Sequence, residues 1–213
     1  MKFKAFLFDL NGTMIDDMDY HIRAWHRILN GLGANITLEE MKEQCYGKNH
    51  ELLERTFPGR FTYAEKDQMS LEKEKEYQSL YTPVLLPGLA DFLEKSYQQG
   101  IPMAIGSAAI MFNIDFVLDR LNLRHYFKVL ISADDVEHSK PHPETWLKCA
   151  HALGVAPTDC LVFEDSPRGV EAAEAAGMHS FVLTTLHKPE DFSGFKKVIG
   201  VAGDFGGSMT DDR

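Results

Sequence analysis

Four short groups of polar residues carry side chains that suit metal or phosphoryl chemistry. Carboxylates can act as nucleophiles or as oxygen ligands of a divalent cation, whereas lysine and serine can hold an anion. The groups are Asp9-Leu10-Asn11-Gly12-Thr13, Ser107, Lys140-Pro141 and Glu164-Asp165-Ser166. Each group alone also has a structural explanation, because polar residues often begin loops and Asp-Ser often caps a helix. Their meaning therefore depends on whether the fold brings them together.

Each group follows a short apolar run, a pattern typical of strands buried on both faces of a parallel sheet. These runs lie at residues 3–8, 102–106, 128–132 and 160–163, and a further run at 180–183 ends at Thr184-Thr185. Helical patterns lie between them, at residues 88–99, 143–153 and 166–177. The alternation predicts an α/β fold with a doubly wound, mostly parallel sheet. Because ligands bind beyond the carboxyl ends of such strands, the four groups should meet at one site.

Residues 15–84 interrupt this alternation. Ile22, Trp25 and Leu29 recur at helical spacing, and further helical patterns follow at residues 38–57 and 64–81. This stretch predicts a helical cap domain, 15–84, inserted into an α/β core domain made of residues 1–14 and 85–213.

Composition narrows the classes of partner. The 213 residues include 22 Lys and Arg against 32 Asp and Glu, for a formal charge of −10. Such an acidic chain argues against nucleic acid and anionic membrane as partners, although not against a small phosphorylated metabolite. The three cysteines lack paired or metal-ligand spacing, and no stretch approaches membrane-spanning length. We therefore expect a cytoplasmic monomer with reduced thiols.

In order, spacing and strand-end placement, the four groups resemble the haloacid dehalogenase (HAD) superfamily. The segment Tyr20-His21-Ile22-Arg23-Ala24-Trp25 resembles its β-phosphoglucomutase branch. The resemblance implies a HAD-like, Rossmann-like core and Mg²⁺-dependent phosphoryl transfer through an aspartyl-phosphate on Asp9. It implies that Asp9, the backbone carbonyl of Asn11 and Asp165 hold Mg²⁺, and that Glu164 acts beside them or through water.

The same resemblance implies where the phosphate binds. Lys140 would neutralise the phosphate and Asp9 together, while Ser107 and the amide of Ala108 would hold the remaining phosphoryl oxygens. A dinucleotide-binding domain is disfavoured, because Gly-x-Gly-x-x-Gly does not follow the first strand. A dehalogenase is disfavoured because the acidic group around Asp165 indicates a metal.

Position 11 departs from the pattern of phosphatases and mutases in this superfamily, which have an acid/base aspartate where this chain has Asn11. An amide cannot exchange a proton at neutral pH, and general acid/base catalysis typically contributes about 10²- to 10⁴-fold. Either Asn11 is an engineered change, or it is natural and implies slow turnover, a good leaving group or a non-catalytic role.

The substrate-recognition positions also differ from the β-phosphoglucomutase branch. His50, within Gly47-Lys48-Asn49-His50, stands where the branch has an arginine, and Ile110-Met111 replaces a lysine and an asparagine. A mutase must hold a phosphate at each end of its sugar, whereas a phosphatase needs one such site. We therefore rank a phosphatase of small metabolites such as sugar phosphates above a β-phosphoglucomutase-type isomerase. A catalytically weak phosphate- or metal-binding protein is the third reading.

Five residues of the cap are candidates for substrate binding or cap closure. His21 either couples substrate to cap closure, as in β-phosphoglucomutases, or is structural, and Trp25 is either a core residue or a ligand. Lys48 and His50 could partly replace the missing arginine. Lys73 matches a cap lysine of the branch only loosely.

Overall fold

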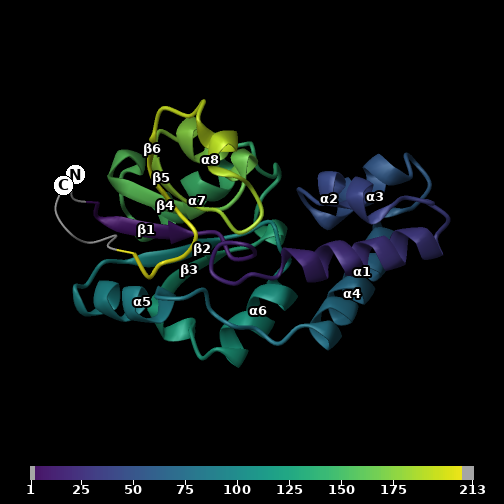
Figure 1. Cartoon of the computed structure of the whole chain (residues 1–213), viewed down its shortest axis with the longest axis horizontal. Helices are drawn as coiled ribbons and strands as arrows, with labels where there is room; N and C mark the ends of the chain where they lie inside the picture. Colours follow the sequence, from purple (N-terminus) through teal and green to yellow (C-terminus); the bar gives the residue numbers. More distant parts are fainter. Residues whose placement is uncertain (1–2, 208–213) are drawn as a thin grey trace. The chain divides into compact units, whose positions relative to one another are not determined.

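The computed structural model describes residues 3–207, which form an α/β protein (Figure 1). This range divides into two compact units. Residues Asp17–Pro83 make one unit, and the residues up to Asp16 and from Val84 onward make the other. The bounds differ from the expected 15–84 by two residues at the start and one at the end. Among the helices of residues 3–207, none has the length and apolar character needed to cross a bilayer.

A six-stranded parallel sheet forms the centre of the larger unit, which confirms the predicted fold class. Its strands are β1 (Ala5–Phe8), β2 (Met103–Gly106), β3 (Phe127–Ile131), β4 (Cys160–Glu164), β5 (His179–Leu183) and β6 (Val198–Ala202). They lie in the order β3-β2-β1-β4-β5-β6, and all neighbours are parallel. The chain builds outward from β1 on one side and returns to build from β4 on the other. The reversal between β1 and β4 is where such sheets bind ligands.

Helices cover both faces of this sheet (Figure 1). They are α5 (Leu89–Gln98), α6 (Met111–Arg120), α7 (Glu144–Leu153) and α8 (Pro167–Ala175). On one face of β1, Leu7 lies in a buried cluster with Trp146 of α7. On the other face, the rings of Phe6 and Phe8 lie 5.4 Å and 6.2 Å from that of Phe92 in α5. Burial on both faces explains why this strand reads as an uninterrupted apolar run.

Two elements of the larger unit were not expected from the sequence. The edge strand β6 is only half-buried, and Gly200 at its centre separates Val198-Ile199 from Val201-Ala202. A Cβ at Gly200 would lie 2.4 Å from the Phe181 ring, which explains the glycine. Helix α6 lacks a side-chain N-cap, and its apolar residues, at positions 111, 112, 114 and 116–118, did not give a clear helical period.

The smaller unit contains four helices within the described chain: α1 (Met18–Gly31), α2 (Leu38–Gln44), α3 (Asn49–Thr56) and α4 (Tyr63–Leu80). Ile22, Trp25 and Leu29 of α1 pack with Met41 of α2 and Leu53 of α3 in one buried cluster. The single pattern expected at residues 38–57 is therefore two helices. They are separated at residues 45–48, where Gly47 adopts a φ of 77° that other residues rarely adopt.

Candidate active site

Lys140 joins two carboxylates at the carboxyl ends of β1 and β4. Its Nζ donates to Asp9 Oδ1 at 2.6 Å and to Glu164 Oε1 at 2.8 Å, and the residue is 8% exposed. The ammonium also lies 4.2 Å from the ring centroid of Trp146. Three residues expected to meet are thus in direct contact, and the aromatic ring beneath the lysine was not anticipated.

The start of helix α8 holds Glu164 in place. Glu164 Oε2 accepts from the amides of Asp165 and Ser166, at 2.9 Å and 2.8 Å, and from the Ser166 hydroxyl at 3.0 Å. Ser166 caps the helix by accepting from the Gly169 amide at 3.1 Å. A Cβ at Gly169 would lie 1.7 Å from Glu164 Oε1. The glycine therefore leaves room for the carboxylate that Lys140 contacts.

Asp165 packs against the loop that carries Asn11. Its Oδ1 accepts from the Thr13 hydroxyl at 3.1 Å. Gly12 adopts a φ of 77°, and a Cβ there would lie 2.2 Å from Asp165 Oδ2. Any other residue at position 12 would be strained and would collide with the carboxylate. Asp9 and Asp165 thus flank a loop whose backbone passes directly against one of them.

Negative charge is in excess at this site, where three buried carboxylates face one ammonium. Burial, followed by the repulsion of Glu164 and Asp9, raises the pKa of Asp165 well above its usual value. Burial lowers the pKa of Lys140, but the attraction of Asp9 and Glu164 outweighs it, so the net pKa of Lys140 is raised. The lysine therefore stays charged, and a further cation would allow Asp9 and Asp165 to be ionised together.

The donor set fits a hard cation with few protein ligands. Within residues 3–207, no three or more His, Cys, Asp or Glu side chains are arranged to hold a metal ion. Mg²⁺ does not need such a cage, because it is commonly held by one or two carboxylates and keeps several waters. Asp9, Asp165 and the Asn11 carbonyl supply oxygen atoms alone, so the residues present fit Mg²⁺.

Ser107 ends β2, the strand on the other side of β1. It is 2% exposed, its amide donates to Ile131 at 2.9 Å, and its Oγ accepts from the Ala109 amide at 3.1 Å. This contact closes a tight turn around Ala108. The hydroxyl still has a proton to donate, so a bound anion could accept it.

Four threonine and tryptophan contacts around the site were missed by reasoning from the sequence. They are those of Thr13 with Asp165, Thr185 with Gly12, and Trp146 with both Lys140 and the Gly169 carbonyl. The only available signal was the Thr184-Thr185 pair after an apolar run. The two threonine contacts span 152 and 173 residues of sequence, so they leave no local pattern.

The residues singled out in the helical unit lie in different surroundings. His21 is 6% exposed; its Nδ1 lies 2.6 Å from Lys73 Nζ and its Nε2 lies 3.2 Å from Asp17 Oδ2. Tyr77 donates its hydroxyl to the same Asp17 oxygen at 2.6 Å, and Lys73 also pairs with Glu74 at 2.9 Å. These residues form a buried polar cluster between α1 and α4.

Trp25 and His50 have partners inside their own unit. Trp25 is 2% exposed within the hydrophobic cluster, which favours the core reading. His50 Nε2 lies 2.8 Å from Asp67 Oδ1. Lys48 precedes α3, and its amide donates to Glu51 at 2.9 Å.

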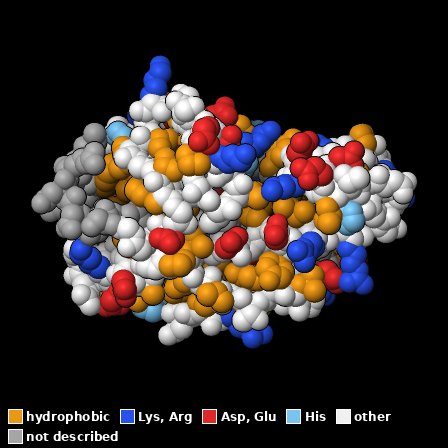
Figure 2. All heavy atoms as spheres, viewed as in Figure 1, with side chains coloured by type: hydrophobic (Ala, Val, Ile, Leu, Met, Phe, Trp, Pro, Cys, Tyr) orange, Lys and Arg blue, Asp and Glu red, His pale blue; other side chains and the backbone are white. Residues whose placement is uncertain are grey.

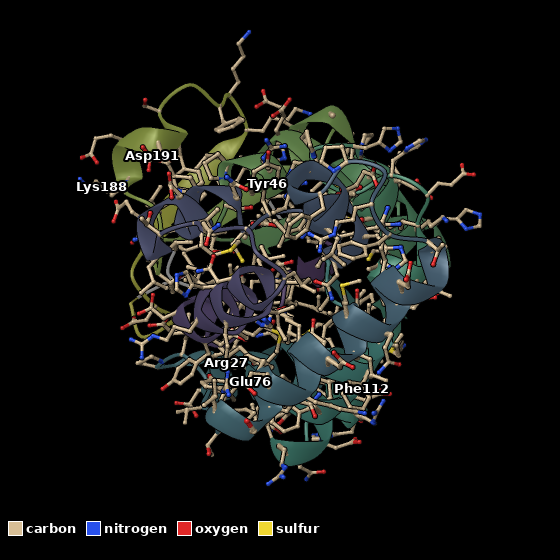
Figure 3. The ribbon with its side chains drawn as sticks, turned by 90° about the vertical axis from the view of Figure 1, so that its right-hand side faces the viewer. Arg27, Tyr46, Glu76, Phe112, Lys188 and Asp191 are labelled. Atoms are coloured by element: carbon tan, nitrogen blue, oxygen red, sulfur yellow. The ribbon has the colours of Figure 1, made fainter. Side chains whose placement is uncertain are left out.

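The chain just before Lys48 is held by an arginine. Arg55 donates to the Gln44 and Tyr46 carbonyls at 3.0 Å and 2.7 Å, and its guanidinium lies 4.0 Å from the Tyr46 ring centroid. Figure 3 labels Tyr46, together with the ion pair of Arg27 on α1 and Glu76 on α4.

Comparison with known proteins resolves which family this geometry represents. Residues 6–183 match the family of haloacid dehalogenase-like hydrolases. The chain belongs to this family. A fructose-1-phosphate phosphatase of Escherichia coli is 31% identical over 185 residues, covering 87% of this chain and 98% of the relative. A β-phosphoglucomutase of Bacillus subtilis is 32% identical over 185 residues, covering 82% and 80%.

Solved structures of haloacid dehalogenase-like proteins have the same fold. A β-phosphoglucomutase from Clostridium difficile has a TM-score of 0.83 at 28% identity, covering 96% of this chain and 92% of that one. The CbbY protein of Rhodobacter sphaeroides, solved with phosphate, has a TM-score of 0.84 at 23% identity, covering 97% and 96%. This chain is therefore a haloacid dehalogenase-like enzyme of the phosphatase or phosphomutase kind.

Proposed function

We propose that this enzyme is a Mg²⁺-dependent phosphatase of small phosphorylated metabolites, chiefly sugar phosphates, and that it acts through an aspartyl-phosphate on Asp9. The observation that carries the proposal is the buried contact of Lys140 with Asp9 and Glu164, beside Asp165. The relatives support the substrate class, since they include a fructose-1-phosphate phosphatase and a hexitol phosphatase.

Each residue of the site has a distinct task in this reaction. An oxygen of Asp9 attacks the phosphorus, a bond forms between them, and the bond to the sugar oxygen breaks, so that the sugar leaves and takes a proton from water. A water molecule then attacks the same phosphorus, and the bond to Asp9 breaks to release free phosphate and restore the carboxylate. Lys140 holds Asp9 in position and offsets charge on the phosphoryl oxygens, and the Ser107 hydroxyl and Ala108 amide hold others. Asp9, the Asn11 carbonyl and Asp165 would hold Mg²⁺, which supplies positive charge between the phosphate and the carboxylates. Enzymes of this family generally use this ion.

Asn11 sets a limit on the rate. A departing sugar alkoxide needs a proton, and the Asn11 amide cannot provide one at neutral pH. Substrate binding survives, because the amide has the shape of the expected carboxylate. Sugar phosphates are therefore bound but turned over slowly, and phosphates whose leaving groups depart without protonation react faster.

Phosphoglucomutase activity is the second candidate, supported by the Bacillus subtilis relative. It ranks lower because His50 replaces the cap arginine of that branch and Ile110-Met111 replaces its lysine and asparagine. A weak phosphate-binding role, suggested by Asn11, ranks third. For either enzyme activity we propose that the helical unit serves as the cap.

Incubation with Mg²⁺ and a panel of sugar phosphates, nucleotides, pyrophosphate and acyl phosphates tests the proposal. We expect free phosphate as product and an acid-stable label on Asp9 after rapid quenching. The Asp9→Asn variant, which keeps the size of the side chain, is expected to lose both. An isomerised sugar phosphate without free phosphate would instead establish the mutase, and label on another residue would contradict the nucleophile.

A further inference from the structure

Thr185 reaches the loop that carries Asn11 from a strand that is not adjacent to β1. It follows β5, and β4 lies between β5 and β1 in the sheet. Nevertheless, its Oγ1 donates to the Gly12 carbonyl at 2.6 Å, across 173 residues of sequence. The contact passes over the end of β4, where Asp165 also lies.

Gly12 is thereby held from two sides. Asp165 Oδ2 occupies the space that a Cβ would take, and Thr185 binds the carbonyl. Asp165 also accepts from the hydroxyl of Thr13, the next residue. Glycine has a wide choice of backbone conformations, so its left-handed φ of 77° depends on contacts of this kind.

Fixing the Gly12 carbonyl also fixes its neighbours. A peptide unit is planar, so the direction of the Gly12 carbonyl sets the orientation of the Gly12–Thr13 peptide. Once that plane and both backbone dihedrals of Gly12, φ and ψ, are set, the preceding Asn11–Gly12 peptide has one orientation. Its oxygen is the Asn11 carbonyl, the backbone atom proposed to bind Mg²⁺.

We propose that Thr185 is a positioning residue, which aims the Asn11 carbonyl by holding Gly12. This inference rests on the proposed function for its catalytic consequence, but its structural part does not. Thr184 provides the contrast. Its hydroxyl donates to the Ala202 carbonyl at 3.3 Å, toward the edge strand β6 and away from the site.

Because Thr184 and Thr185 are adjacent and of one type, the same substitution can be compared at both positions. Thr185→Val removes the hydroxyl and keeps the shape, Thr185→Ser keeps the hydroxyl, and Thr184→Val is the control. Loss of one hydrogen bond typically changes an equilibrium by roughly two- to tenfold. We expect Thr185→Val to speed amide hydrogen exchange in the segment 10–14 by that factor in EDTA, and the other two variants to match the wild type.

A second measurement reads the consequence for the metal. The Mg²⁺ concentration that gives half-maximal hydrolysis of p-nitrophenyl phosphate is expected to rise three- to tenfold in Thr185→Val only. The unfolding temperatures of the three variants in EDTA separate this shift from a general loss of stability. Should Thr185→Val fail to fold, Thr185→Ala makes the same comparison.

The outcomes separate this inference from the proposed function. If the wild type does not hydrolyse phosphate esters but exchange quickens only in Thr185→Val, the proposed function falls and the holding of Gly12 stands. If exchange and Mg²⁺ dependence are the same in Thr185→Val and Thr184→Val, the positioning role is overturned.

Discussion

At the scale of single residues, the proposed mechanism gives position 11 the largest influence on the rate. The substitution Asn11→Asp is expected to raise turnover by roughly one to three decades, because it supplies a proton donor within the usual range of acid/base catalysis. The gain should be largest for sugar phosphates and smallest for acetyl phosphate, whose leaving group departs with little help. Steady-state kinetics on both substrates check this.

Two control measurements show whether Asn11→Asp keeps the fold and the response to Mg²⁺. The variant must unfold at a similar temperature and still respond to Mg²⁺. A well-folded, Mg²⁺-responsive Asn11→Asp protein without any gain on sugar phosphates would mean that position 11 does not serve as the acid/base position.

Asp165 is the residue whose charge the site tolerates least without a cation. We expect Mg²⁺ to raise the unfolding temperature of the wild type. At a Mg²⁺ concentration one hundred times the Kd for this ion, the free energy of unfolding should rise by about 2.7 kcal/mol. Asp165→Asn should lose most of this gain, yet be at least as stable as the wild type in EDTA, because a buried, repelled carboxylate has gone. Differential scanning calorimetry with Mg²⁺ and with EDTA measures both.

Asp115→Asn is the matched control for Asp165, since Asp115 is exposed and pairs with Arg124 on the surface. It should respond to Mg²⁺ as the wild type does. Equal Mg²⁺ responses in Asp165→Asn and the wild type would remove Asp165 from the metal site.

At the scale of elements, helix α8 contains a glycine, Gly169, which lowers helix stability but leaves room for the Glu164 carboxylate. Replacing a glycine within a helix by alanine usually stabilises the helix by about 1 kcal/mol. At Gly169 the opposite is expected, because the new Cβ would overlap Glu164 Oε1 and displace the partner of Lys140. Thermal unfolding and phosphatase assays of Gly169→Ala should both show a loss.

Gly177, which follows the same helix, is not a suitable control for Gly169→Ala because its φ is positive. The control is Glu171→Ala on the exposed side of α8, which should leave activity unchanged. Undiminished activity and stability in Gly169→Ala would show that Glu164 can move without consequence.

Glu144, the first residue of α7, forms hydrogen bonds with the loop that precedes Lys140. Glu144 accepts from the amides of Glu137 and His138, at 3.0 Å and 2.9 Å, and pairs with Lys148 at 2.8 Å. Hydrogen bonding from Lys148, followed by the two amides, lowers the pKa of Glu144 from 4.5 to about 2. Because the folded-state value is the lower one, this carboxylate stabilises the fold above about pH 4.5 and ceases to do so as pH falls toward about 2.

In Glu144→Gln, the free energy of unfolding should therefore fall less steeply as the pH is lowered. Urea unfolding at pH 3 and pH 6 is expected to show a smaller difference between these pH values than in the wild type. Glu137→Gln, at an exposed position in the same loop, is the control. An unchanged pH dependence in Glu144→Gln would contradict the lowered pKa.

Central elements could be predicted from the sequence, whereas marginal ones could not. Strands β1, β2 and β4 are buried on both faces, so their apolar runs are unbroken. In the half-buried β6 a glycine separates the apolar residues, and between α2 and α3 Gly47 adopts a positive φ. The meeting of Asp9, Lys140 and Glu164 followed from the rule that strand ends converge. The contacts of Thr185 with Gly12 and of Trp146 with Gly169 depend on how separate elements pack, which no local pattern records.

At the scale of the whole molecule, charge is spread in both signs. On the face in Figure 2, Lys and Arg side chains lie among Asp and Glu and are not gathered into one broad patch. The concentrated charges lie inside each unit instead. The α/β unit encloses Lys140 with its carboxylates, and the helical unit encloses Lys73 with Glu74 and Asp17.

The contacts of Thr185 and Asp165 with Gly12 also affect how the protein ages. In an Asn-Gly pair the glycine nitrogen can attack the asparagine side-chain carbonyl, expelling ammonia and forming a cyclic imide that water opens to aspartate or isoaspartate. On the proposed mechanism, an aspartate at position 11 would supply the acid/base group, so aged protein would gain activity that fresh protein lacks. While Thr185 and Asp165 hold Gly12, ring closure is restrained. We expect peptide mapping to find deamidation at Asn11 far slower in the folded chain than in urea, so that the fold itself preserves the asparagine.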